Sequence, residues 1–271
     1  MRLLDLATRL PLVMGMWNKF PIGSVPTRVE YGVFPYPNYA YGAYWSSLLA
    51  ARLGIPRITV IELGVAGGRG LVALEKASIE IEKVTGVGID VVGFDSGEGM
   101  PAPVDFRDAP HIWGEGFYKM EPEKLRARLN RAQLVLGNVA KTIPEWMQNG
   151  KKSPIGFISF DLDYYSSTKI ALELFNGPES SHLPRVHCYF DDLAGNDLSC
   201  MNEFIGEHLA IKEFNEQNPT RKLCKIEQMR LSRPRWEKWQ DRMYAFHDFA
   251  HSQYNTLVIP RTKSESQLPL N

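Results

Sequence analysis

The stretch ITVIELGVAGGRGLVALEK, residues 58–76, decides the fold. Its first six residues are mostly apolar and rich in β-branched side chains, which is typical of a buried strand. Four glycines follow within the next seven positions, a composition that permits a tight turn and close approach of a ligand to the backbone. Beyond residue 70 the apolar positions recur at helical spacing. The stretch therefore predicts a strand, a glycine turn and a helix, the first unit of an α/β fold.

The same alternation continues along the chain. Helix-like segments separate short apolar runs, and strand, helix and strand in succession imply a parallel sheet with right-handed crossovers. We predict an α/β fold with a doubly wound, Rossmann-like, mostly parallel seven-stranded sheet and helices on both faces. Besides residues 58–63, the strands are expected at 91–95, 133–137, 155–161, 185–191, 222–229 and 254–260.

A ligand is expected at the glycine turn, because open parallel sheets bind ligands beyond the carboxyl ends of their strands. Two cofactors compete for this turn. The spacing of the glycines fits a short-chain dehydrogenase that binds NAD(P), and Tyr165 with Lys169 has the spacing of its proton-transfer pair. Glu62 argues against that reading, because its negative charge would lie close to a pyrophosphate.

S-adenosylmethionine suits the turn better, because its sulfonium and ammonium groups are attracted to an acidic residue. Asp95, at the end of the second strand, can accept both ribose hydroxyls, although an aspartate here could also cap a turn. Asn138 follows the third strand and is a candidate wall for adenine. The predicted cofactor-binding residues are Glu62, Gly64, Val65, Ala66, Gly68, Asp95, Ser96, Asn138 and Asp161.

Three carboxylates are expected to meet at the ends of two neighbouring strands. Asp161 ends the strand 155–161, and Asp191 and Asp192 end the next strand. Adjacent strands lie about 4.8 Å apart, so these side chains converge and need a cation. Oxygen ligands favour Mg²⁺, with Mn²⁺ or Ca²⁺ as alternatives. Asp163 and Asp192 could instead be caps of a helix or a turn.

Five motifs in order resemble the TylF-like macrocin O-methyltransferase family. The family shows an ExGxxxG turn, an FDSFEGLP-like strand end, a GxxxxT[LI]P segment, a DxDxYxST junction and a VDDY-like strand end. This chain has ELGVAGG at 62–68, FDSGEGMP at 94–101, GNVAKTIP at 137–144, DLDYYSST at 161–168 and FDDL at 190–193. The resemblance covers roughly residues 58–195.

The resemblance implies a magnesium-dependent O-methyltransferase that uses S-adenosylmethionine, with Asp161, Asp191 and Asp192 as metal ligands. The acceptor would be a hydroxyl of a sugar, glycoside or related polyol, thus a small molecule or a glycan. Gly97 and Leu193 depart from the family pattern, which indicates a different substrate wall. The Tyr165 and Lys169 spacing is then a by-product of the DxDxYxST junction.

The expected chemistry is an in-line displacement in which a hydroxyl held at the cation loses its proton and attacks the methyl group. We predict Asp161 and Asp163 as catalytic residues, with Asp161 as the base and Asp163 or a lid histidine as alternatives. The competing hypothesis remains a short-chain dehydrogenase that uses Tyr165 and Lys169. The third hypothesis is a catalytically inactive module that binds S-adenosylmethionine or a protein partner.

Composition excludes several other classes. Lysine plus arginine equals aspartate plus glutamate at 31 each, so no bulk charge indicates nucleic acid as a partner. No run of about 18 apolar residues predicts a membrane span. The three cysteines form no CxxC pattern, which is typical of reduced thiols in a cytoplasmic protein. A homo-oligomer is compatible with these features.

The flanks carry weaker signals. We expect residues 1–57 to form an N-terminal helical and aromatic arm, and residues 31–46, with six tyrosines or tryptophans, to be an irregular half-buried loop or a lid. The main domain is predicted at 58–260, with a basic and aromatic lid insertion at about 230–253, and residues 261–271 as a flexible tail. HDFAH at 247–251 imitates a zinc-protease helix, but no third ligand is apparent.

Overall fold

The computed structural model describes residue 8 and residues 10–150, 152–227 and 229–259. Within these ranges, seven strands form one sheet in the order β3-β2-β1-β4-β5-β7-β6. The first five strands run parallel, and β7 is antiparallel to both of its neighbours, which confirms the predicted fold class. The strands are β1 (Arg57–Leu63), β2 (Gly88–Asp95), β3 (Gln133–Leu136), β4 (Ile155–Phe160), β5 (His182–Phe190), β6 (Arg221–Lys225) and β7 (Met243–Asp248).

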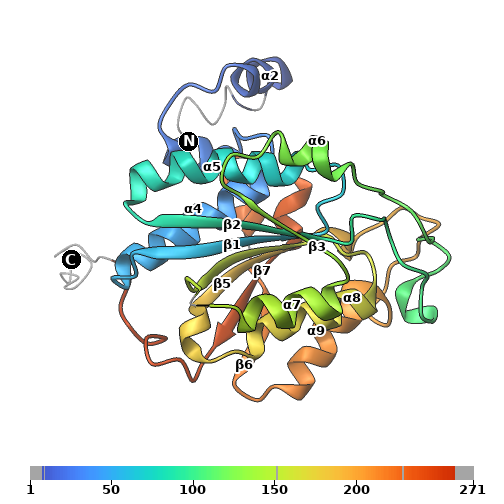
Figure 1. The fold of residues 1–271 in the computed structure, drawn as a ribbon. Coiled ribbons are helices and arrows are strands. Elements are labelled where there is room, and N and C mark those ends of the chain that lie inside the picture. The colour runs from blue at the N-terminus through green and yellow to red at the C-terminus, as the bar shows by residue number, and fades with distance from the viewer. Residues whose placement is uncertain (1–7, 9, 151, 228, 260–271) are drawn as a thin grey trace, which may run out of the picture.

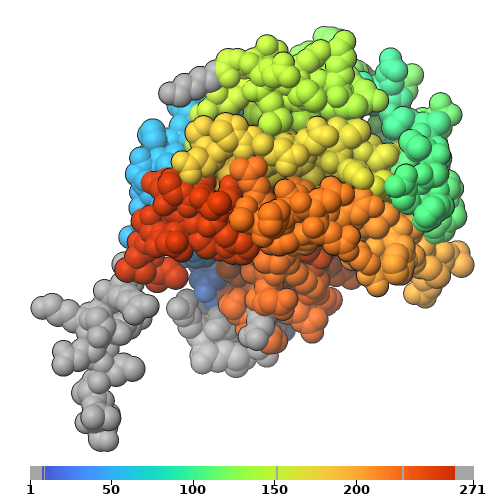
Figure 2. All heavy atoms as spheres, turned by 90° about the horizontal axis from the view of Figure 1, so that it is seen from below, coloured from blue at the N-terminus to red at the C-terminus, as the bar shows by residue number. Residues whose placement is uncertain are grey.

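Helices cover both faces of the sheet (Figure 1). Helices α4 and α5 lie on one face, and α7, α8 and α9 lie on the other, where Figure 2 shows their green-yellow, yellow and orange residues side by side. No helix in the described ranges is both long and apolar enough to cross a bilayer. The helices are α2 (Pro11–Lys19), α3 (Val25–Glu30), α4 (Pro37–Arg52), α5 (Arg69–Thr85), α6 (Pro122–Arg126), α7 (Val139–Gln148), α8 (Tyr165–Ala171) and α9 (Gly206–Gln217).

The central strands are buried on both faces, as their nearly continuous apolar sequences require. Their register brings three residues into line, because Leu63 pairs with Phe160 and Phe160 pairs with Phe190. The two phenylalanine rings stack with centroids 4.4 Å apart. Each of these three residues is the last of its strand, and the next residues along the chain are Gly64, Asp161 and Asp191. The register therefore gathers the turn and the carboxylates at one edge of the sheet.

The prediction that residues 31–46 form an irregular loop or a lid is wrong, because most of them belong to α4. Pro37 occupies the first turn of this helix, where its missing N–H removes no hydrogen bond. Gly42 faces the sheet, and a Cβ there would lie 2.1 Å from the ring of Phe157. A residue without a Cβ is therefore needed where α4 crosses β4. Buried side chains of α4 and of the sheet belong to the same hydrophobic core.

The C-terminal third also differs from the prediction. The strand expected at 222–229 is confirmed as the shorter β6, but residues 254–259 contain no strand. In the described ranges the last strand is β7, so residues 243–248 of the predicted lid insertion 230–253 belong to the sheet. His247 lies in this strand and His251 in the turn that follows, which rules out a zinc-protease helix. The predicted tail, 261–271, lies outside the described residues.

Candidate active site

A cavity of about 770 Å³ opens at the carboxyl ends of the parallel strands. Its walls come from the loops that follow β1 to β5, which is where the doubly wound topology leaves space for a ligand. Of the predicted site residues, it is lined by Gly64, Ala66, Asp95, Ser96, Asn138, Asp161, Asp163, Asp191 and Asp192. Val65, Gly68 and Glu62 are not among its lining residues.

The glycine turn forms the floor of one half of the cavity. Gly64 has a positive φ of 84°, and a Cβ on it would lie 1.7 Å from the carbonyl oxygen of Asp161. Only glycine fits between the first turn and the end of β4. Asp95 holds the turn from the neighbouring strand, because its Oδ2 accepts the backbone N–H groups of Val65 and Ala66 at 2.9 and 2.8 Å.

Asp95 also organises its own loop. Its Oδ1 accepts the backbone N–H of Gly97 at 2.7 Å, so both carboxylate oxygens already carry hydrogen bonds. The side chain of Ser96 donates to the carbonyl of Gly99 at 2.7 Å. Asn138 caps α7 through the N–H of Ala140 at 2.8 Å. These residues therefore have structural bonds in addition to the ligand contacts that the sequence predicted.

Glu62 lies behind the turn instead of in the cavity. It is 2% exposed, and its Oε1 accepts a hydrogen bond from the Tyr39 hydroxyl at 2.8 Å. Its Oε2 is buried and has no hydrogen-bond partner within the described ranges. Burial raises the pKa of Glu62 to about 8, against the lowering effect of the Tyr39 hydrogen bond. The structure thus places Glu62 between the turn and α4, where it supports the turn from behind.

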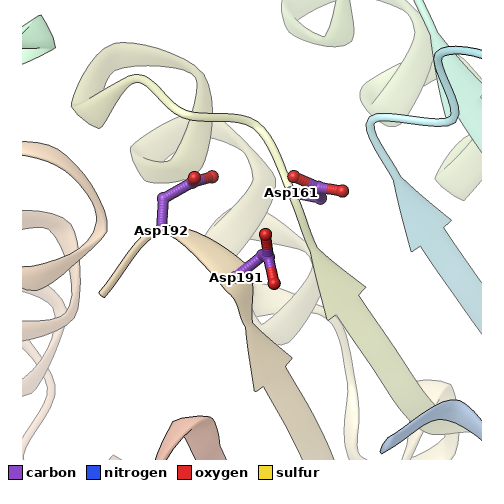
Figure 3. A group of neighbouring side chains, drawn as sticks. All are labelled: Asp161, Asp191 and Asp192. Carbon is purple, nitrogen blue, oxygen red and sulfur yellow. The ribbon is translucent and has the colours of Figure 1, made fainter. Parts of the chain in front are cut away.

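The three predicted metal ligands converge at the other half of the cavity (Figure 3). One oxygen from each of Asp161, Asp191 and Asp192 lies within 4.8 Å of the other two. Asp161 comes from the end of β4, and the paired aspartates come from the end of β5. Among the described residues, these three form the one group of histidine, cysteine and acidic side chains with ligand atoms close enough to share a metal ion.

Burial and mutual repulsion dominate the electrostatics of this cluster. Burial, followed by the charge of Asp192 and then of Asp191, raises the pKa of Asp161 well above its ordinary value. Burial and then the charge of Asp163 do the same to the pKa of Asp192. Burial, together with Asp191, raises the pKa of Asp163 to about 7. These raised pKa values mean that these aspartates favour proton uptake, and that a bound cation would favour their ionised forms instead.

Two residues that sequence reasoning missed hold the cluster from behind. Arg242 donates to Oδ1 of Asp191 at 2.8 Å, so one of the five basic residues of the segment 230–242 reaches the site. Glu207, fully buried at the start of α9, accepts the backbone N–H of Asp192 at 3.0 Å, and its other oxygen has no hydrogen-bond partner among the described residues. Neither Glu207 nor Arg242 belongs to a motif that could have marked it in the sequence.

Tyr165 and Lys169 lie outside the cavity lining. The Lys169 amino group donates to the Tyr165 hydroxyl at 2.8 Å and to Glu213 at 2.7 Å, and Tyr165 also donates to Glu213. Arg107 donates to the same hydroxyl at 3.2 Å. This network ties α8 to α9, so the Tyr/Lys spacing has a structural explanation. None of the histidines in the described ranges lines the cavity either.

Neither a family model nor a curated protein sequence matches the chain. A crystal structure of CalS11, calicheamicin methyltransferase, aligns with a TM-score of 0.50 and 22% identity, over 76% of this chain and 78% of that chain. The chain shares the fold of this methyltransferase. The apo structure of CalS11, described as a TDP-rhamnose 3'-O-methyltransferase, aligns with a TM-score of 0.44 and 20% identity, over 76% and 79% of the two chains. The O-methyltransferase TomG from Streptomyces achromogenes gives 0.40 and 14%, over 76% and 78%.

Proposed function

We propose that the protein is an O-methyltransferase that uses S-adenosylmethionine and a divalent metal ion, and that its acceptor is a hydroxyl of a sugar, glycoside or related polyol. One observation carries the proposal. The glycine turn with Asp95, and the carboxylates of Asp161, Asp191 and Asp192, line the same cavity from neighbouring strand ends. A methyl donor on the turn and a hydroxyl at the carboxylates would therefore share one space. The TylF-like motifs support the same reading.

In this proposal the turn holds the donor. Gly64 and Ala66 offer backbone close to the cavity, without a large side chain to obstruct the donor. Asp95 uses part of its acceptor capacity on backbone N–H groups, and a carboxylate has about four acceptor positions in all, so it can still accept ribose hydroxyls. Asn138 and Val139 form a wall on the side of β3, where adenine would lie.

The acidic cluster fits a hard dication. Its three carboxylates supply oxygen ligands from one side only, which would leave other positions for water and substrate. Oδ1 of Asp191 is occupied by Tyr189 and Arg242, while its other oxygen remains available. A Mg²⁺ ion held by Asp161, Asp191 and Asp192 would act as a Lewis acid toward an acceptor hydroxyl. Mn²⁺ or Ca²⁺ would suit the same ligands.

The protein's own residues would then orient the acceptor and accept its proton. Asp161 and Asp163 line the cavity beside the cluster, and burial raises the pKa of Asp163 to about 7, so that this side chain would hold a proton more readily than an ordinary aspartate. We assign the proton-acceptor role to this pair, because no histidine in the described ranges lines the cavity. Holding oxygen, methyl carbon and sulfur in line contributes up to roughly 7–11 kcal/mol in favourable model systems.

Calorimetric titration tests the proposal without knowledge of the acceptor. S-adenosylmethionine should bind to the protein with a 1:1 stoichiometry, and S-adenosylhomocysteine should compete with it. Mg²⁺ should bind with measurable heat, and Asp191→Asn should abolish that heat while donor binding persists. Binding of NAD(P)H in place of S-adenosylmethionine would overturn the proposal in favour of the dehydrogenase reading.

A further inference from the structure

The cavity is strongly one-sided in charge. Although the whole chain has equal numbers of basic and acidic residues, no lysine, arginine or histidine of the described ranges lines the cavity. Arg242 donates to Asp191 but is not itself a lining residue. Acidic side chains at seven positions line the cavity: Asp95, Glu98, Glu115, Asp161, Asp163, Asp191 and Asp192.

Five of these side chains already have roles in the proposed function, but Glu98 and Glu115 have none. Both are solvent-exposed, and neither carboxylate makes an ion pair or hydrogen bond within the part of the chain that the structure describes. Their loops are joined, because the N–H of Met100 donates to the carbonyl of Phe117 and the N–H of Gly116 donates to the carbonyl of Met100, each at 2.8 Å. The pairing fixes both glutamates to one rim of the cavity.

Three aromatic rings accompany the two glutamates on this rim. Trp113, Phe117 and Tyr118 line the cavity, and the last two remain 48% and 54% exposed. Their centroids lie 6.2 Å apart, and Trp113 lies 6.4 Å from Tyr118. Tyr118 has a φ of 61°, a left-handed conformation that costs a non-glycine residue strain and is concentrated at functional sites. The rim thus presents open aromatic faces beside unpaired carboxylates.

We infer that the acceptor is a glycoside carrying a protonated amine, and that Glu98, Glu115 and the rings of Trp113, Phe117 and Tyr118 bind that amine; this inference rests on the proposed function. Aromatic faces and carboxylates both attract ammonium groups, and the rings also offer flat surfaces to a sugar. A dication and the sulfonium of the donor would neutralise only part of the acidic lining. A phosphate-bearing acceptor, such as a nucleotide-linked sugar, would be repelled from the same rim.

Binding of paired probes tests this inference. Kanamycin, tobramycin and methyl glucosaminide are each compared with their N-acetylated forms, and UDP-glucose serves as the anionic probe. Titrations are run with Mg²⁺ and S-adenosylhomocysteine present, and again with neither. At least one amine-bearing probe should bind at least about tenfold more tightly than its acetylated form and than UDP-glucose.

Paired variants assign the effect to the rim. Glu98→Gln with Glu115→Gln should weaken binding of that amine-bearing probe by about three- to tenfold, the range that two exposed ion pairs supply, and should leave the acetylated probe unchanged. Glu173→Gln with Glu216→Gln removes the same charge from exposed sites outside the cavity and should change neither.

Two results would overturn the inference: no amine-bearing probe binds more tightly than its acetylated form, or UDP-glucose binds as tightly as the best of them. Equal losses in the rim variant and the control variant would overturn the assignment to Glu98 and Glu115. The titrations without donor and metal separate this inference from the proposed function, because an acidic rim should bind the amine even if the donor does not bind.

Discussion

Aspartates at the same edge of one sheet are held in two different ways. Asp95, at the end of β2, accepts three backbone N–H groups and so joins the glycine turn to its own loop. Asp161, Asp191 and Asp192, at the ends of β4 and β5, face one another instead. Among the described residues, their hydrogen-bond donors are Tyr189 and Arg242 on Asp191 and the N–H of Asp163 on Asp192.

The difference separates a carboxylate with backbone partners from carboxylates that we propose as metal ligands. Backbone donors around Asp95 offset the cost of burying its charge, so removing it would leave several donors without acceptors. The three clustered aspartates repel one another, so their arrangement costs stability until a cation arrives. The same kind of substitution should therefore have opposite effects on stability at the two places.

The largest effect is expected from Asp161→Asn. This change removes one ligand and one charge from the cluster, so methyl transfer should fall by about 10²–10³-fold or more, the scale of losing one electrostatic contact at a reacting centre. The metal-free variant should unfold at a higher temperature than the natural protein, because burial and neighbouring charges oppose the ionised form of Asp161. Radiolabel transfer from the donor and thermal unfolding measure the two effects.

The control is Asp197→Asn, at an exposed position outside the cavity lining. It should change neither transfer nor unfolding. A metal-free Asp161→Asn protein that unfolds more readily than the natural protein would contradict the assignment of Asp161 to a repulsive cluster.

The second effect, smaller than the loss of methyl transfer, is a loss of stability in Asp95→Ala. Three backbone N–H groups lose their acceptor, and with partial rescue by water we expect a decrease in the free energy of unfolding of about 2–4 kcal/mol. Donor affinity should fall as well, because the glycine turn is released. Asp95→Asn keeps one acceptor oxygen, so its free energy of unfolding in urea should lie between those of the natural protein and Asp95→Ala. Equal stability of all three proteins would show that Asp95 does not organise the turn.

The third effect concerns Glu62 and appears only as the pH changes. Its folded pKa is raised to about 8 by burial, above its ordinary value of 4.5. Between these values the unfolded chain binds fewer protons at this position than the folded protein, so the contribution of Glu62 to stability is full below about pH 4.5 and declines as the pH rises to about 8. Glu62→Gln should remove that decline.

Urea unfolding of the natural protein and of Glu62→Gln at pH 5, 7 and 9 measures the difference. The variant should gain stability relative to the natural protein as the pH rises. Parallel pH profiles in the two proteins would mean that Glu62 is ionised in the folded state at neutral pH.

Sequence reasoning located the parallel half of the sheet because its strands are buried on both faces and read as continuous apolar runs. Because the carboxyl ends of parallel strands meet at one edge of a sheet, Asp95 and the three clustered aspartates were expected there. The structure brings all four to one cavity. These predictions required only the order of the elements along the chain. The roles assigned to these residues stay predictions.

The sequence misled where contacts between distant segments decide the local structure. Residues 31–46 read as too irregular for a core helix, yet most of them form α4, where Gly42 is required by the ring of Phe157, more than a hundred positions later. The antiparallel β7 was missed because it lies inside a basic and aromatic segment, and the apolar run at 254–259 imitated a strand.

Other site residues gave no local signal. Glu207 and Arg242 reach the cluster only because α9 and the segment before β7 fold back against the end of β5. Likewise, the aromatic rim at 113–118 is brought to the cavity by the backbone pairing of Met100 with Gly116 and Phe117. The segments that meet at these contacts lie far apart in the sequence, so no single motif contains both of them.

The most direct test is the anomalous scattering of Mn²⁺ in crystals grown with S-adenosylhomocysteine. We predict a single strong peak within about 2.0–2.6 Å of carboxylate oxygens of Asp161, Asp191 and Asp192, with the bound homocysteine sulfur across the same cavity. A map with no peak between these three side chains at millimolar Mn²⁺, or with the aspartates turned apart, would contradict the account.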